Sequence, residues 1–117
     1  MKTVLIVEDE AIIAMTYKRA LRKNYLTILV STGIEAVNSV KNSKPDLILM
    51  DIKLKGNMNG IEAARQIQDL FTIPFFFLSG NTDQDTKNKA LSLNPCGYLK
   101  KPINHKELVR TVNSIIL

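Results

Sequence analysis

Short apolar blocks alternate with longer amphipathic segments five times along this chain of 117 residues. The blocks consist mainly of aliphatic and aromatic side chains and carry little charge, which is typical of strands covered on both faces. The alternation predicts an α/β domain, because strand–helix–strand units with right-handed crossovers build a parallel sheet flanked by helices. The predicted strands are 3–7, 27–30, 46–50, 74–78 and 97–100, and the predicted helices are 10–23, 33–42, 60–71, 84–93 and 104–116.

Helix start and stop signals support these boundaries. A capping residue followed three positions later by glutamate opens three of the helices. The pairs are Thr32 with Glu35, Asn59 with Glu62, and Asn104 with Glu107. Asn94-Pro95 predicts the end of the fourth helix, and Pro45 prevents the second from continuing.

Two helices carry an apolar stripe that predicts their buried faces. In the first helix the residues expected to be buried are Ile12, Ala14, Met15, Ala20 and Leu21, with Lys18, Arg19, Arg22 and Lys23 facing solvent. In the last helix they are Leu108, Val109, Val112, Ile115 and Ile116.

Composition limits the class of protein. Apolar residues make up 45% and charged residues 23% of the chain, as in a soluble globular domain, and we expect a single domain over residues 1–117. No apolar stretch approaches the ~20 residues that span a bilayer, and no signal-peptide pattern opens the chain. The single cysteine, Cys96, excludes an internal disulfide and fits a reducing compartment, so we expect a cytoplasmic protein without a membrane partner.

The net charge of +5 is weak support for nucleic-acid binding. The lysines are spread along the chain, and no basic run alternates with aromatic residues. Solvated helix faces explain the charge better, and no direct nucleic-acid binding is expected.

Acidic residues follow two of the apolar blocks directly. Glu8 and Asp9 come after Val4–Val7, and Asp51 comes after Leu47–Met50. The carboxyl ends of parallel strands share one edge of a sheet, where α/β folds bind ligands. Carboxylates crowded at one edge repel each other unless a cation joins them, so the sequence predicts an acidic pocket that binds a hard divalent ion, and Mg2+ is the expected one.

Two further strand ends carry residues suited to phosphoryl chemistry. The fourth predicted strand is followed by Ser79-Gly80, and the fifth is followed by Lys101-Pro102. A carboxylate that attacks a phosphoryl group meets electrostatic repulsion, which a cation relieves, while a lysine and a hydroxyl hold the phosphoryl oxygens.

Over its whole length the chain resembles the receiver domains of two-component response regulators. The matching stretches are Val4–Glu10, Asp46–Ile52, Phe77–Gly80 and Gly97–Pro102. The resemblance implies a flavodoxin-like (βα)5 fold, doubly wound, with a five-stranded parallel sheet in the order 2-1-3-4-5. It also implies a phosphorylation-dependent switch that is not a turnover enzyme and catalyses only its own phosphotransfer and dephosphorylation.

The resemblance assigns a role to each site residue. Asp51 would accept the phosphoryl group from a sensor histidine kinase or a phosphotransfer protein. Mg2+ would be held by Asp9 and Asp51, by Glu8 through water, and by the backbone carbonyl of Lys53. Ser79 and Lys101 would bind the phosphoryl oxygens, and the bond from Lys101 to Pro102 would be cis.

The resemblance also implies how phosphorylation at the site would change a distant surface of the domain. Ser79 and Tyr98 match the switch pair, which would alter a face built from the fourth helix, the fifth strand and the fifth helix. That face would control an effector protein or a fused output domain, with Lys87, Lys89, Lys100 and His105 as candidate surface residues. Lys53 and Asn81 occupy the two variable positions beside the site, where side chains guide or block the attacking water. The sequence leaves the direction of that effect open, as it does a pairing of Lys53 with Glu8.

Three other interpretations stay open from the residues alone. A degenerate receiver would serve only as an interaction module. An aspartyl-phosphate phosphatase of the haloacid-dehalogenase type would need a second aspartate two positions after Asp51, where this chain has Lys53. A flavodoxin-like cofactor binder would need a phosphate loop after the first strand, where Glu8 and Asp9 would instead repel a phosphate.

Overall fold

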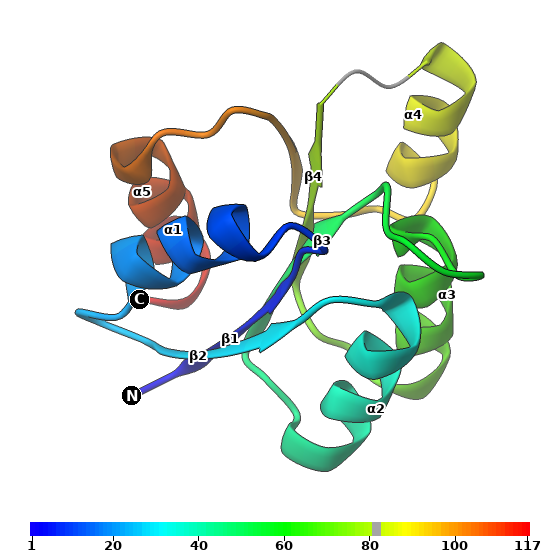
Figure 1. Ribbon diagram of the computed structural model, residues 1–117. Coiled ribbons are helices and arrows are strands. Elements are labelled where there is room, and N and C mark those ends of the chain that lie inside the picture. Colours follow the sequence, from blue (N-terminus) through cyan, green and yellow to red (C-terminus); the bar gives the residue numbers. More distant parts are fainter. Residues whose placement is uncertain (81–82) are drawn as a thin grey trace.

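A computed structural model describes residues 1–80 and 83–117 and contains five strands and five helices in strict alternation within that part of the chain (Figure 1). The elements are β1 (Thr3–Val7), α1 (Ala11–Leu21), β2 (Leu26–Val30), α2 (Gly33–Ser43), β3 (Leu47–Asp51), α3 (Gly60–Leu70), β4 (Phe75–Ser79), α4 (Gln84–Leu91), β5 (Gly97–Lys100) and α5 (His105–Ile116).

The strands form one parallel sheet in the order β2-β1-β3-β4-β5, which confirms the predicted doubly wound fold. Its central strands are fully buried, as their uncharged sequences predict. Three strands differ from prediction by one residue: β2 begins one residue earlier, at Leu26, and β3 and β4 each begin and end one residue later. β3 and β4 extend through Asp51 and Ser79, because Asp51 pairs with Leu78 and Ser79 pairs with Lys100 in the ladders. Both polar residues are therefore fixed by the sheet rather than carried on a loop.

The helices cover both faces of the sheet and divide the core in two (Figure 1). Helices α1 and α5 pack on one face over alternate strand residues such as Ile6 and Leu49. Helices α2, α3 and α4 cover the other face, over Val7, Met50 and Phe77. Because successive side chains of a strand point to opposite faces of the sheet, the same short strands contribute residues to both cores.

The predicted capping residues at the helix starts are confirmed, whereas α4 ends at Leu91 with Ser92 as its C-cap, before the predicted stop at Asn94-Pro95. Asn59 and Glu62 form a reciprocal capping box, and Thr32 and Asn104 each accept a hydrogen bond from the backbone amide three residues on. Asn94 adopts the left-handed backbone conformation, with φ of 55°. Within the described residues, every helix is too short or too polar to cross a lipid bilayer.

The predicted buried face of α1 was partly wrong. Ala14 and Leu21 are buried, but Ile12 and Met15 are 83% and 46% exposed. The buried stripe instead runs through Ala14, Tyr17 and Leu21, whose spacing of three and four residues follows the helical period. Tyr17 is therefore the buried residue in the middle of α1, where the sequence pattern predicted Met15. In α5, likewise, Ile115 is 41% exposed although Leu108, Val112 and Ile116 are buried.

Candidate functional site

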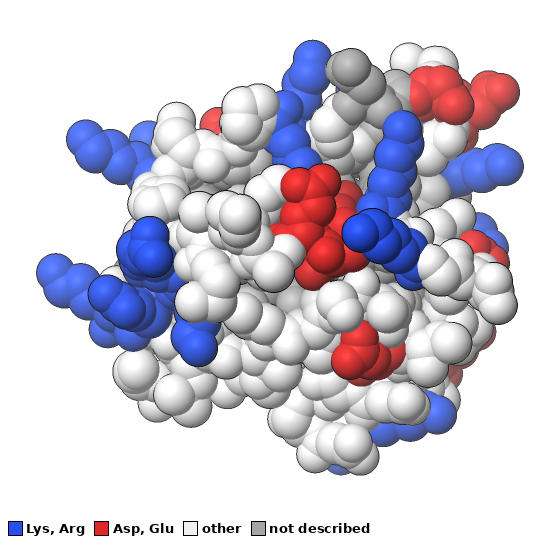
Figure 2. Space-filling view, in the orientation of Figure 1, with Lys and Arg blue, Asp and Glu red and all other residues white. Residues whose placement is uncertain are grey.

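Four strand ends converge at the carboxyl edge of the sheet and bring the predicted site residues together. Glu8 follows β1, Asp51 ends β3, Ser79 ends β4, and Lys101 follows β5. Glu8, Asp51 and Ser79 are the only buried polar or charged residues in the described part of the chain. Figure 2 shows an acidic cluster near the centre of this face with basic side chains beside it. The topology alone explains this convergence, since parallel strands place their carboxyl ends on one side.

Three carboxylates form the acidic pocket. Glu8, Asp9 and Asp51 each offer an oxygen, and these oxygens lie within 4.8 Å of one another. The backbone amide of Glu10 donates to Oε2 of Glu8 at 3.1 Å, and the backbone amide of Lys55 donates to Oδ2 of Asp9 at 3.2 Å. Glu10 occupies the N-cap position of α1 without a side-chain capping bond. The acidic residues after β1 therefore form the pocket and do not cap the helix.

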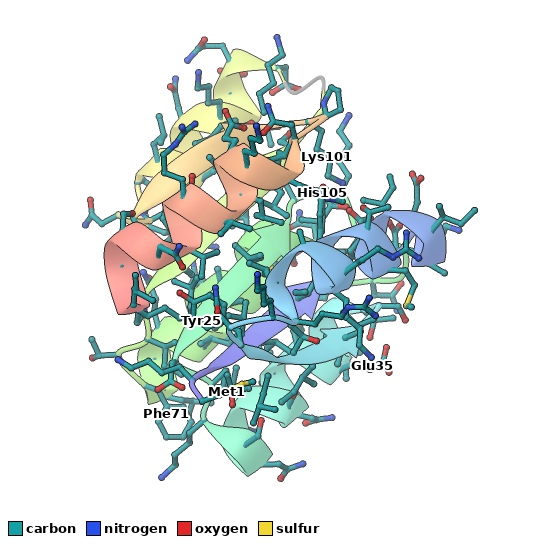
Figure 3. The ribbon with its side chains drawn as sticks, turned by 90° about the vertical axis from the view of Figure 1, so that its left-hand side faces the viewer. Met1, Tyr25, Glu35, Phe71, Lys101 and His105 are labelled. Atoms are coloured by element: carbon teal, nitrogen blue, oxygen red, sulfur yellow. The ribbon has the colours of Figure 1, made fainter. Side chains whose placement is uncertain are left out.

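Lys101 joins two of these carboxylates. Its ammonium Nζ lies 2.5 Å from Oε1 of Glu8 and 3.0 Å from Oδ2 of Asp51. Its backbone amide donates to the carbonyl oxygen of Ser79 at 2.7 Å, and the Lys101–Pro102 peptide bond is cis, as predicted. Lys100 is exposed, also as predicted. The lysine before the proline thus faces the pocket, and Figure 3 labels it above the start of α5.

Burial controls the protonation of the pocket. Loss of hydration raises the pKa of Glu8 to about 7, against the lowering effects of the bonds from Lys101 and the Glu10 amide. Burial likewise raises the pKa of Asp51, although Lys101 opposes it. For Lys101, burial favours the neutral amine, yet its bonds to the carboxylates raise its pKa overall.

The two partners of the Lys101–Glu8 ion pair therefore respond differently. Lys101 faces two carboxylates, Glu8 and Asp51, whereas Glu8 faces one cation and the like charge of Asp51, so burial outweighs pairing only for Glu8.

The pocket fits a hard divalent cation. It offers three oxygen ligands from carboxylates, the donor type that Mg2+ prefers, and two of the three belong to buried residues. The raised pKa of Glu8 and of Asp51 reflects negative charge that burial leaves poorly hydrated, which a cation would stabilise.

The remaining predicted residues lie at the rim or outside the described part. Lys53 is exposed, and its ammonium contributes to lowering the pKa of Asp83, after the larger effect of the Thr86 amide. Asn81 lies outside the described residues. Tyr98 is half-buried against the core, and the Lys87 ammonium lies 5.3 Å from the centre of its ring.

Two contributors to the site were missed by sequence reasoning. One is the Lys55 amide that binds Asp9, which no side-chain pattern could reveal. The other is Gly60, where an added Cβ would lie 2.0 Å from the carbonyl oxygen of Asp51. The glycine at the start of α3 therefore allows the helix to approach the end of β3 closely. The capping pattern of Asn59 and Glu62 predicts that Gly60 is the first residue of a helix, and this pattern is the sequence signal that could have identified the glycine.

Known proteins resemble the chain over nearly all of its length. A family model described as the response regulator receiver domain matches residues 4–113. The transcriptional regulatory protein YvrH of Bacillus subtilis is 34% identical over 114 residues, covering 96% of this chain and 48% of that protein. The DNA-binding response regulator MtrA of Mycobacterium tuberculosis is 32% identical, covering 95% of this chain and 49% of its own length. The chain thus spans about half the length of these relatives.

Solved structures agree in fold. The signal receiver domain of a modulated diguanylate cyclase from Desulfovibrio desulfuricans G20 is 33% identical, with a TM-score of 0.91, covering 99% of this chain and 94% of that one. The N-terminal domain of a three-domain response regulator, sensory box and GGDEF protein from Carboxydothermus hydrogenoformans is 35% identical. Its TM-score is 0.88, with 97% of this chain and 93% of that one covered.

Proposed function

The chain belongs to the response regulator receiver domain family of two-component signalling, and we propose that it is a phosphorylation-dependent switch whose phosphoryl acceptor is Asp51. Receiver domains of this family are not enzymes in the usual sense, and we assign this chain only its own phosphotransfer and dephosphorylation. We take residues 1–117 as the receiver domain and the cytoplasm as its location.

One observation carries the proposal: a buried Asp51 carboxylate lies 3.0 Å from the Lys101 ammonium and within 4.8 Å of the Glu8 and Asp9 oxygens. A carboxylate held between a cation and further acids is the arrangement that phosphoryl transfer needs, because transfer depends on positioning and charge compensation. A surface aspartate such as Asp69 has none of these partners in the described residues.

The donor is a phosphohistidine of a sensor kinase or phosphotransfer protein. An Asp51 carboxylate oxygen forms a bond to phosphorus while the phosphorus–nitrogen bond breaks, and the imidazole keeps that electron pair. Lys101 binds a phosphoryl oxygen as negative charge moves toward Asp51, and the Ser79 hydroxyl, at the end of the neighbouring strand, holds another.

Asp9, Asp51, the backbone carbonyl of Lys53 and, through water, Glu8 are the ligands that we assign to Mg2+. When bound, the ion would neutralise charge on the carboxylates and the phosphoryl oxygens. The gathered carboxylates support this assignment over the phosphatase alternative, for which Lys53 supplies no second acid.

Phosphorylation would then draw Ser79 toward the phosphoryl group, and Tyr98 would turn inward. The change would alter the face of α4, β5 and α5, which would control an effector protein or an output domain. Lys53 and Asn81 would set the lifetime of the phosphorylated form. The pairing of β4 with β5 supports a coupling between Ser79 and Tyr98, since Ser79 is aligned with Lys100 and Tyr98 with Phe77 in the two neighbouring strands.

The test is incubation of the protein with Mg2+ and acetyl phosphate, followed by intact-mass measurement. We expect an adduct of about 80 Da, the mass of one added phosphoryl group, and we expect Asp51→Asn to abolish it. Asp69→Asn is the matched control, because it removes the same charge from an exposed position on α3.

Removal of Mg2+ with EDTA should also abolish the adduct. A phosphorylated Asp51→Asn protein, or an Asp69→Asn protein that loses the adduct equally, would refute Asp51 as the acceptor. An unmodified wild-type protein, with a known receiver domain modified in parallel, would leave the degenerate interaction module as the better interpretation.

A further inference from the structure

A groove between α1 and α5 lies on the helical face beside the acidic pocket. It has a volume of about 610 Å³ and is lined by Arg19, Ala20, Lys23, His105, Lys106, Val109, Arg110 and Asn113. Figure 3 looks onto this side of the molecule and labels His105 where α5 begins, below Lys101. None of the pocket residues Glu8, Asp9 and Asp51 lines the groove, so it is a separate surface.

The groove is basic on both walls and aliphatic between them. Arg19 and Lys23 come from the end of α1 and the turn after it, and Lys106 and Arg110 come from α5. All four are exposed, while Ala20 and Val109 between them are half-buried. No acidic residue lines the groove.

The positive charge in the groove is not compensated within the chain. Within the part of the chain that the structure describes, none of the four basic side chains of the groove forms an ion pair. A basic residue on a convex helix face is compensated by water. Here, cations from α1, from the turn after it and from α5 line one groove together with Ala20 and Val109, and a bound anionic partner would be attracted by all four.

The spacing of the charges indicates the form of that partner. Lys106 and Arg110 are four residues apart and therefore lie on one side of α5, about 6 Å apart along its axis. A helix that packs along α5 presents carboxylates four residues apart at the same spacing, and an apolar side chain between them reaches the floor formed by Ala20 and Val109. The groove contains no Phe, Tyr or Trp side chain on which a nucleic-acid base would stack.

We propose that the α1–α5 groove binds an acidic amphipathic helix of a partner protein. Its carboxylates pair with Arg19, Lys23, Lys106 and Arg110, and an aliphatic side chain packs on Ala20 and Val109. The site is independent of Asp51, so the proposal does not rest on phosphorylation and can be tested on the unmodified protein.

The experiment is a titration of the isotope-labelled, unphosphorylated protein, followed by NMR at low salt. The probe is a synthetic helical peptide of about 14 residues with paired glutamates four apart and leucines between them. We expect chemical-shift changes confined to α1 and α5, and weaker binding for two matched peptides, one with glutamine for glutamate and one with serine for leucine.

The protein variants complete the test. Arg19→Gln with Arg110→Gln should weaken binding by about three- to tenfold, the effect of two partly exposed ion pairs. Lys41→Gln with Arg65→Gln removes the same charge from α2 and α3, on the opposite face of the sheet, and should leave binding unchanged. Equal weakening in both double variants would overturn the proposal, because general attraction by the net charge would then suffice.

Three other ligands of the groove predict different results in the NMR titration, and each of these results would overturn the proposal. A short single-stranded oligonucleotide that shifts the same residues as strongly as the peptide would indicate a polyanion site. Equally strong shifts of the same residues with inorganic pyrophosphate would indicate a small-anion site. Shifts that appear with rising protein concentration, without peptide, would indicate a second copy of the chain.

Discussion

Burial of Glu8 makes the stability of the cation-free protein fall as pH rises. The pKa of this carboxyl is about 7 in the folded protein, raised chiefly by burial, against 4.5 as its ordinary value. Between these values the folded state binds a proton that the unfolded chain has released, so the free energy of unfolding decreases with rising pH. Above about pH 7 both states are deprotonated at this site and the loss is complete.

The size of the effect follows from the difference between the two pKa values. One pKa unit corresponds to about 1.4 kcal/mol, so Glu8 accounts for on the order of 2–3 kcal/mol between pH 4.5 and 7.5. The raised pKa of Asp51 acts in the same direction. Lys101, whose pKa is raised, contributes stability that is present throughout this window and is lost only in strong base.

Urea unfolding in EDTA at a series of pH values measures this dependence. Glu8→Gln should flatten the profile, because the variant carries no proton that titrates at this position. Glu10→Gln is the matched control, since Glu10 is exposed and its side chain makes no capping bond, and it should leave the profile unchanged. A wild-type stability that rises from pH 5 to 7.5, or a profile that Glu8→Gln does not change, would refute the reasoning.

Mg2+ should reverse the trend. Metal binding requires deprotonated carboxylates and stabilises the folded state by mass action, so the same Mg2+ concentration should raise the unfolding midpoint more at pH 8 than at pH 5.5. Equal stabilisation at both pH values would contradict a site that includes Glu8.

Three further predictions concern packing and charge, each measured by urea unfolding. Gly60→Ala should cost about 2–4 kcal/mol, because its Cβ would overlap the carbonyl oxygen at the end of β3, whereas Gly80→Ala, with open space around the new Cβ, should cost little. Equal costs would refute the close approach. Ile12→Ala should change stability by less than about 0.5 kcal/mol, while Leu21→Ala should cost about 2–5 kcal/mol. The reverse order would refute the orientation of α1. Lys101→Met should destabilise the protein by about 1–3 kcal/mol at pH 8 and by less at pH 5.5, where protonation reduces the unpaired negative charge. An effect independent of pH would refute the pairing with buried carboxylates.

The comparison of sequence and structure separates what local pattern encodes from what packing decides. Strand positions followed from apolar blocks with turn and cap residues between them, so β1 and β5 were predicted with their observed bounds. The face of α1 was predicted less well, because Met15 and Tyr17 both suit an apolar stripe. Only contact with the sheet and α5 selects Tyr17 for the core, leaving Ile12 and Met15 exposed.

The sequence by itself determined the order of the elements and the types of residue at the strand ends, because these depend on the period of apolar residues and on turn chemistry. The tertiary structure alone decided the pairing of Lys101 with both Glu8 and Asp51, the bond from the Lys55 amide to Asp9, and the contact between Gly60 and Asp51. The pairs involved are separated by 9 to 93 residues in the chain. Their proximity depends on which strands are neighbours and how closely helices approach them, and neither quantity is a property of any single segment.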